Sequence, residues 1–424
     1  MLNGCPANTR REVTNRLSQI SFHLHQMVRR MWFLPATFSL LAIVTITVAY
    51  GVAKFVPDRM PLEMPSDAIR SILTILASSL LTVAVFALST MVTALSTASQ
   101  VTTPRAVPLI VEDRTAQTSI SVFIGAFLFA ILGIIALSAG IYSQAGRLVL
   151  FLVTLGMVVL VTVALIRWIG QISAIGRVAE TIDKVEAATA KGFHTVDEPP
   201  LMGCRPQTGG PKGKAISCAT IGYIQHIDLA NLQDAAERLD VVVDVMARPG
   251  AYVFPGRALA LVERELPEEE TERLADCFVV GDTRTFDSDP RFGLIVLNEI
   301  ASRALSPGIN DSGTAIDVIG TQVRILADWA CLERNGDVLF ERLTITPLTV
   351  ADLMVDAFRP IARDGAGQIE VVLRLLAGLH TLSGIPLLAS EARATARDVE
   401  ARAMTALLAA SDRQALASAA AFAH

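Results

Sequence analysis

Four long apolar runs, separated by short polar connections, dominate the N-terminal part of the chain. They cover residues 33–53, 71–98, 119–141 and 148–166. A helix needs about 20 apolar residues to cross the hydrocarbon core of a bilayer, and each run comes close to or exceeds that length. The pattern therefore predicts four transmembrane helices. The connection between the last two runs is so short that these two helices should form a tight hairpin.

A basic and polar segment, residues 1–32, precedes the first apolar run. Apolar residues recur there at three- and four-residue spacing from Leu17 to Met31, and arginines accompany them. Such a pattern is typical of an amphipathic helix that lies on an anionic membrane surface. A cytosolic extension of the first span explains the same residues equally well, so both interpretations stay open.

The basic residues of the connections predict how the spans are oriented. One side of the membrane should hold the N-terminal arginines, Arg105, Arg114 and the basic residues from Arg167 onward. This side carries more lysine and arginine residues than the opposite side. Connections rich in lysine and arginine stay in the cytoplasm. We therefore expect a membrane protein whose N- and C-termini are both cytoplasmic.

A polar stripe runs along the second apolar run with a period of about 3.6 residues, which places its members on one face of a helix. Its members are Ser71, Thr74, Ser78, Thr82, Ser89, Thr93, Ser96 and Gln100. Small hydroxyl residues permit close packing between membrane helices. The same face would also suit the lining of a water-filled pore. No ionisable residue lies in the middle of any run, which disfavours an ion- or proton-coupled carrier.

The pattern after the fourth run indicates a soluble α+β domain. An amphipathic helix is expected to continue the fourth span, followed by a loop rich in glycine and proline. Short strand-like segments, joined by Pro249-Gly250 and Pro255-Gly256 turns around a helix over 229–239, predict a small β-barrel or sandwich-like unit. The predicted organisation is 1–32 basic segment, 33–169 four-span membrane domain, 170–214 helical extension and loop, 215–265 β-rich unit, and 266–424 mostly helical domain.

Within the last part, helices are expected near 350–361, 370–382 and 391–408, and the alanine-rich tail is expected to fray. The densest chemistry lies in a polar motif over 281–317. Asp289 followed by Pro290 is a good helix start, and Asp311 or Ser312 would cap the next helix. Glu299 and Arg303 are four residues apart in the favourable order for an ion pair.

The motif supplies the candidate ligand- or ion-binding residues Asp282, Arg284, Asp287, Asp289, Glu299, Arg303, Asn310 and Asp311. Acids outnumber arginines there, which favours a cation such as a divalent metal ion over a bare phosphate. No cofactor-binding motif is evident. A network of ion pairs and helix caps without any ligand explains the same residues.

Composition agrees with a membrane protein and narrows the remaining classes. Of 424 residues 52% are hydrophobic and only 18% are charged, which is too apolar for an average soluble protein. The net charge of −5 gives no electrostatic basis for nucleic-acid binding. The five cysteines are odd in number and form no CxxC pair, so neither a disulfide framework nor a zinc site is expected, and a reduced cytosol suits the soluble half.

The motifs resemble those of the bacterial predicted-membrane-protein family catalogued as domain of unknown function 2254. The resemblance covers nearly the whole chain and is most specific in the block Arg303-Ala-Leu-Ser-Pro-Gly-Ile-Asn-Asp311. Ser288 stands where a glutamine is usual and Ser312 where a proline is usual. The resemblance is carried by Arg303–Asp311 together with Ser99-Gln100, Pro104-Arg105, Gly222-Tyr-Ile, Asp228, Pro249-Gly250, Gly256, Arg284-Thr285, Asp289, Phe292-Gly293 and Thr314-Ala315. It implies an integral membrane protein and no assigned activity.

Three functions fit these features. The first is a homo-oligomeric, channel-like or sensor protein in the lipid bilayer, controlled by a cytosolic domain that binds a small ligand or ion. The second is a membrane-tethered enzyme that uses the carboxylates of the polar motif, although no HExxH, nucleophile-elbow or paired metal motif accompanies them. The third is a structural or assembly protein of the membrane. The absence of catalytic motifs favours a role other than catalysis.

Overall fold

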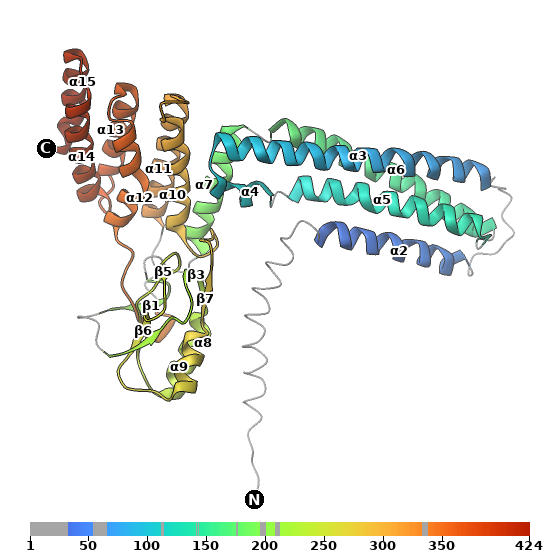
Figure 1. The fold of residues 1–424 in the computed structure, drawn as a ribbon, viewed down its shortest axis with the longest axis horizontal. Helices are drawn as coiled ribbons and strands as arrows, with labels where there is room; N and C mark the ends of the chain where they lie inside the picture. The colour runs from blue at the N-terminus through green and yellow to red at the C-terminus, as the bar shows by residue number, and fades with distance from the viewer. Residues whose placement is uncertain are drawn as a thin grey trace, which may run out of the picture. The chain divides into compact units, whose positions relative to one another are not determined.

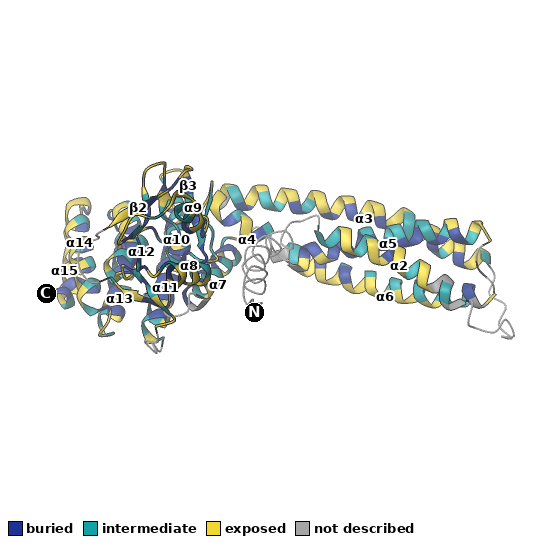
Figure 2. Ribbon diagram, turned by 90° about the horizontal axis from the view of Figure 1, so that it is seen from below, coloured by how far each residue is buried: buried dark blue, intermediate teal, exposed yellow. Residues whose placement is uncertain are grey.

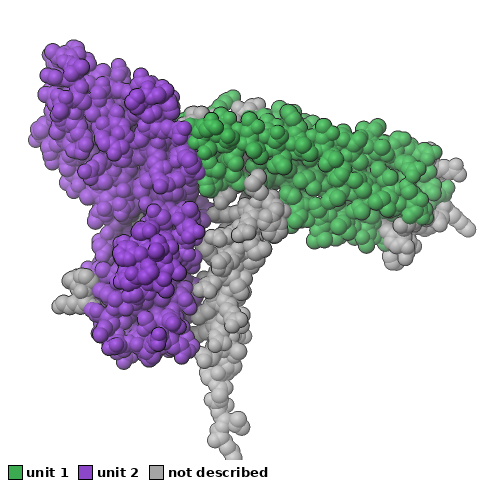
Figure 3. Space-filling model, viewed as in Figure 1, with its two compact units in different colours: residues 1–100, 107–180 green, residues 101–106, 181–424 purple. Residues whose placement is uncertain are grey.

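The computed structural model describes residues 33–53, 66–111, 114–140, 142, 144–174, 177–195, 201–207, 213–332 and 338–424. The predictions for segment 1–32 lie outside these residues. The chain divides into two compact units (Figures 1 and 3). Met1–Gln100 and Val107–Glu180 form the N-terminal unit, and Val101–Ala106 and Thr181–His424 form the C-terminal unit. A short segment between two membrane helices thus belongs to the C-terminal unit.

The described residues of the N-terminal unit are mainly helical. Among them, three stretches are long and apolar enough to cross a membrane, Ser66–Gln100, Thr115–Ser138 and Gly146–Ile172, which agrees with the second, third and fourth predicted spans. The first predicted span forms a helix of 21 residues, but its described apolar stretch, Phe33–Val48, is shorter, so this crossing stays a prediction. The helices are α2 (Phe33–Ala53), α3 (Ser66–Val101), α4 (Val107–Val111), α5 (Arg114–Ser138) and α6 (Gln144–Ala174).

Helix α5 is the centre of this unit and packs against both α2 and α6. Half of its membrane stretch is buried, against 22% for α3 and 17% for α6. Glycines let the neighbours approach closely, because a Cβ at Gly125 would lie 3.1 Å from Phe38 and one at Gly133 would lie 3.1 Å from Leu73. Helix α3 contributes Leu73, Leu80 and Met91 to the core and leaves a long exposed face on its outer side (Figure 2).

The β-strands of the C-terminal unit form two open sheets rather than a closed barrel. The larger sheet has the order β1-β8-β4-β6-β2 and the smaller one the order β5-β3-β7. The strands are β1 (Cys204–Pro206), β2 (Lys214–Ser217), β3 (Gly222–Ile227), β4 (Val243–Val245), β5 (Tyr252–Val253), β6 (Ala258–Val262), β7 (Phe278–Gly281) and β8 (Phe340–Ile345).

Strands from outside the predicted β-rich unit explain this difference. Strand β8 lies within a region predicted to be helical, yet it pairs in parallel with both β1 and β4. Parallel neighbours are remote in sequence, so a local pattern does not reveal them. The strands enclose one apolar core that includes Ile216, Val243 and Leu343.

The helices of the C-terminal unit largely match those expected. The helix predicted over 229–239 has those bounds, and Asp228 caps it by accepting from Asn231 N. The fourth span ends at Ala174, and the amphipathic continuation forms a separate helix, α7. The helices are α7 (Val178–Thr195), α8 (Leu229–Leu239), α9 (Glu268–Ala275), α10 (Pro290–Ala304), α11 (Ser312–Cys331), α12 (Val350–Asp364), α13 (Ile369–Ser383), α14 (Ala389–Ala406), α15 (Ala410–Ala420) and the short η2 (Ala421–Ala423).

The C-terminal tail is packed, which corrects the expectation that it frays. Leu416 and Ala420 of α15 are fully buried, and the ring of Phe422 stacks on His380 with centroids 4.5 Å apart. The side chain of Arg397 also donates to the carbonyl of Ala423 at 2.7 Å. Small alanines permit this close packing against α13 and α14, which composition alone did not indicate.

Candidate functional site

Helix α10 divides the polar motif into separate places, so the predicted single cluster does not form. The helix has 15 residues, which corresponds to about 22 Å at 1.5 Å per residue. Asp289 lies before its first turn, Glu299 lies on its length, and Asn310 and Asp311 lie beyond its last turn. Residues that are close in the motif therefore serve different contacts.

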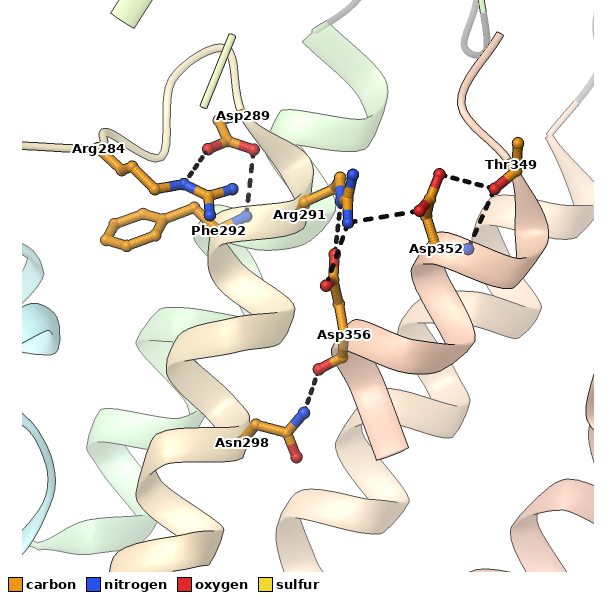
Figure 4. A network of polar contacts seen from close by, with 8 residues as sticks. All are labelled: Arg284, Asp289, Arg291, Phe292, Asn298, Thr349, Asp352 and Asp356. Carbon is orange, nitrogen blue, oxygen red and sulfur yellow. Dashed lines mark hydrogen bonds and ion pairs between the residues drawn. The ribbon is translucent and has the colours of Figure 1, made fainter. Parts of the chain in front are cut away.

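Asp289 begins α10 and is almost completely buried. Its carboxylate accepts from Phe292 N at 3.3 Å, which is the predicted cap, and from Arg284 Nε at 2.7 Å. The guanidinium of Arg284 also lies over the ring of Phe292, 5.4 Å from its centroid (Figure 4). Burial raises the pKa of Asp289, while the hydrogen bond and charge of Arg284 oppose that rise. The pair thus fixes Arg284 against the start of the helix.

Arg291, in the first turn of α10, joins this helix to α12. Its Nε and Nη2 donate to Asp356 at 2.5 and 3.2 Å, and Nη2 also lies 3.7 Å from Asp352 (Figure 4). Thr349 caps α12 and accepts from Asp352 N at 3.1 Å. The side chain of Asn298 donates to the carbonyl of Asp356. These contacts hold the N-terminal halves of the two helices together.

A cavity of about 300 Å³ opens beside these residues. Three arginines contribute to its wall, Arg248, Arg284 and Arg291, and Asp289 is its acidic residue. The remaining wall consists of Met202, Pro249, Gly250, Ala251, Ser288, Pro290 and Leu348.

Gly250 is essential to the shape of this cavity. Its φ of +86° is one that favours glycine, and a Cβ at this position would overlap the carboxylate of Asp289 and come within 2.8 Å of Arg284 Nη2. The Gly250 amide donates to the carbonyl of Ile224 at 2.7 Å. The turn predicted at Pro249-Gly250 is therefore confirmed, and it brings the strand unit against the start of α10.

Arg248 is a second cavity residue with a perturbed pKa. Burial, and then the positive charge of Arg291, lower its pKa to about 10, although Asp352 and Cys204 favour its charged form. Removal of a guanidinium from water disfavours its charge, and a second guanidinium nearby adds repulsion. Arg248 is therefore a group at the cavity wall whose charged form burial disfavours.

Glu299 makes a different contact from the one predicted. It forms an ion pair with Arg105 and accepts from Thr103 Oγ1 at 2.9 Å, and no ion pair among the described residues joins it to Arg303. Thr102, Thr103 and Ala106 are buried in the C-terminal unit. A long-range partner thus replaced the local one, and it fixes the segment 101–106 to the side of α10.

The remaining candidates surround the far end of α10 or lie at the surface. Asn310 has a positive φ of 54° and accepts from Gln368 at 3.0 Å, and Asp311 caps α11 by accepting from Thr314 N at 3.1 Å. Arg303 has a buried Nε without a hydrogen-bond partner. Asp282 and Asp287 are exposed and do not line the cavity.

The arrangement does not bring the acids together. The part of the chain that the structure describes contains no group of three or more His, Cys, Asp or Glu residues that could hold a metal ion. Paired-carboxylate chemistry has no geometric support there either, because Asp289 and Asp311 cap different helices. Sequence reasoning missed Arg248, Asp352 and Asp356. Only the glycine-containing turn after Arg248 could have drawn attention to that arginine.

Every member of the predicted polar stripe on α3 is exposed in the described chain. The hydroxyls satisfy themselves locally, since Thr74 donates to the carbonyl of Arg70 at 2.8 Å and Thr93 to that of Ser89 at 3.0 Å. None of the described helices of the same chain covers this face, so packing among the described helices does not explain the stripe (Figure 2).

Comparison with known proteins places the chain in a family. The predicted membrane proteins of DUF2254 match residues 28–381. An uncharacterized protein of Mycobacterium bovis and one of Mycobacterium tuberculosis are each 31% identical over 133 residues, which cover 28% of this chain. The match spans 26% of the length of these relatives, and no solved structure matches the chain. The family match extends from before α2 into α13, so the chain belongs to the DUF2254 family of predicted membrane proteins.

Proposed function

We propose that the protein is a channel-like sensor of the bacterial inner membrane, in which a cytosolic C-terminal unit binds a ligand and controls the membrane helices. The observation that carries this proposal is the position of residues 101–106. They directly follow the membrane stretch of α3, yet they belong to the C-terminal unit and contact Glu299 of α10. A change in α10 therefore reaches α3 through these polar contacts and then through the peptide chain that joins residues 101–106 to α3.

Connectivity supports this route. Two candidate spans, in α5 and α6, separate residues 101–106 from the rest of the C-terminal unit. An even number of crossings returns the chain to the side from which it left. Both parts of the unit thus lie on one side of the membrane, and the excess of basic residues makes this side the cytoplasm.

The exposed stripe of α3 supports self-association in the membrane. A helix face with eight hydroxyl or amide residues gains more from a neighbouring helix or from water than from lipid chains. Copies of the chain that meet through α3 would place Thr82 and Ser89 at a shared interface or around a central pore. The polar stripe would then be the element that the C-terminal unit controls.

Conductance of the full-length protein in planar bilayers tests the proposal. Thr82→Leu and Ser89→Leu are expected to reduce the current by 10-fold or more, since each replaces a hydroxyl of the stripe with an apolar group. The matched control is Thr162→Leu on α6, an exposed threonine that also bonds only to its own helix. Background current from the wild type, or equal currents from the wild type and both stripe variants, would contradict the proposal.

A further inference from the structure

We propose that the cavity beside the start of α10 binds a small anion, which presents a phosphate or carboxylate group to Arg248, Arg284 and Arg291. The proposal identifies the class of ligand for the controlling unit, and only its biological role rests on the function proposed above. It replaces the expectation of a cation with the opposite charge, because the geometry assigns the acids to other contacts.

The acids near the cavity have partners within the fold. Asp289 is 1% exposed, accepts from Phe292 N and pairs with Arg284. Asp352 and Asp356 pair with Arg291 from α12, and the carboxylate of Asp352 also accepts from Thr349 at 2.7 Å. Each of these three carboxylates thus has a partner within the fold, and the described residues contain no group of three or more His, Cys, Asp or Glu that could hold a metal ion.

The donors that an anion would meet in the cavity are the N–H groups of its arginines. A guanidinium carries five N–H donors. The hydrogen bonds to Asp289 and Asp356 use Nε of Arg284 and Nε and Nη2 of Arg291. Both terminal nitrogens of Arg284 therefore remain able to donate at the cavity wall, where one of them faces Gly250. Arginine forks match the geometry of carboxylate and phosphate oxygens, which makes these donors specific for such anions.

The charges around Arg248 also favour an anion. Arg248 enters the cavity from the strand unit, where burial and the positive charge of Arg291 lower its pKa against the opposing effects of Cys204 and Asp352. An anion between these two groups would offset the repulsion and the loss of hydration. The apolar wall of Met202 and Leu348 lies beside the arginines, so the ligand can carry a short apolar part. A volume of about 300 Å³ limits it to a small molecule.

The position of the cavity gives anion binding a structural consequence. Its wall combines the turn at Gly250, the start of α10 and, through Leu348, the approach to α12. A bound anion would join these three parts. Helix α10 also contacts the segment 101–106 through Glu299, so the ligand would stabilise the element that is covalently connected to α3.

Hydrogen exchange of the full-length protein in detergent tests the proposal, with inorganic phosphate and benzoate as separate probes and sodium chloride at equal ionic strength as the reference. Either probe is expected to slow exchange in peptides covering 248–251 and 284–292, in a saturable manner. Arg248→Gln should raise the apparent Kd at least 10-fold, because it removes a donor without breaking the pairs of Asp289 and Asp356. Arg248→Lys should retain part of the affinity.

Arg342→Gln is the matched control, since Arg342 pairs with Asp240 away from the cavity and its loss should leave binding unchanged. Failure of both probes to protect these peptides, equal affinity in Arg248→Gln, or protection by magnesium chloride alone would overturn the proposal. Binding does not depend on conductance, so bound anion with no current would sink only the proposed channel. Current without any anion binding would sink only the anion site.

Discussion

At the scale of single residues, the sequence motif is a set of helix caps and ion pairs with separate partners. Asp289 caps α10 as local spacing predicted, and Asp311, one of the two predicted candidates, caps α11. Glu299 contacts Arg105 instead of Arg303, which local spacing did not predict. Caps depend on residues a few positions away, whereas the best partner of a charged side chain can come from any part of the fold.

Substitution of Asp289 should separate its two roles. Asn can still accept from Phe292 N but cannot pair ionically with Arg284, whereas Ala loses both interactions. Loss of an N-cap costs about 1 kcal/mol. We therefore expect the midpoint of thermal unfolding of Asp289→Ala to lie about 2–4 °C below that of Asp289→Asn. A loss of about 1 kcal/mol corresponds to that shift in a unit of this size.

Thiol labelling of the full-length protein during heating measures this difference. Cys204 and Cys277 are buried, and burial raises the pKa of each thiol to about 12, so they react only after the C-terminal unit opens. Asp234→Asn, on the exposed face of α8, serves as the control and should leave the midpoint unchanged. Equal midpoints for the two Asp289 variants would show that the cap contributes nothing.

At the scale of elements, helix α10 connects the cavity, α12 and the segment 101–106. Its start contacts the cavity, its Arg291 pairs with α12, and its Glu299 fixes the segment 101–106. Thr189 of α7 packs on Gly293, where any Cβ would overlap the threonine side chain. The sequence showed this helix and its cap but not its contacts with α7, α12 and the segment 101–106, because these three partners are remote in sequence.

Glu299→Gln should loosen the segment 101–106 without unfolding α10. The ion pair with Arg105 is partly exposed, and such pairs contribute about 0.2–1 kcal/mol, so exchange of the Ala106 amide should become about 2- to 5-fold faster. Hydrogen exchange of the full-length protein measures this change. Glu270→Gln removes a comparable partly exposed pair with Arg238 and should not affect residues 101–106. Unchanged exchange in Glu299→Gln would mean that buried Thr102 and Thr103 hold the segment alone.

At the scale of the whole molecule, the two units share one chain that passes between them more than once. Residues 101–106 and the region from Thr181 onward must lie on the same side of the membrane, and we expect that side to be cytoplasmic. The alternative, an external C-terminal unit, would require a reversal of the basic-residue bias.

Cys331 provides the test, because it is an exposed native cysteine in the C-terminal unit. A membrane-impermeant maleimide applied to intact cells should leave the Cys331 peptide unmodified, and permeabilisation should expose it to the reagent. A cysteine introduced by Ser66→Cys at the start of α3 should instead react in intact cells, since the predicted topology places it outside. Modification of Cys331 in intact cells would reverse the orientation.

The sequence by itself determined the features that depend on local pattern. Hydrophobic run length indicated the membrane helices, periodicity indicated the helix over 229–239 and the helices after residue 350, and turn chemistry indicated Pro249-Gly250. These features were readable because bilayer thickness, helical period and backbone conformation act on neighbouring residues.

Only the tertiary structure decided which remote residues meet. The parallel pairing of β8 with β1 and β4, the cavity between Arg248 and Arg291, and the contact of Glu299 with Thr103 all join distant segments. Such contacts depend on how the whole chain packs, and charge counts along the sequence suggested a cation where we propose an anion. Proximity in sequence is therefore a poor guide to electrostatic partners, since a side chain interacts through space.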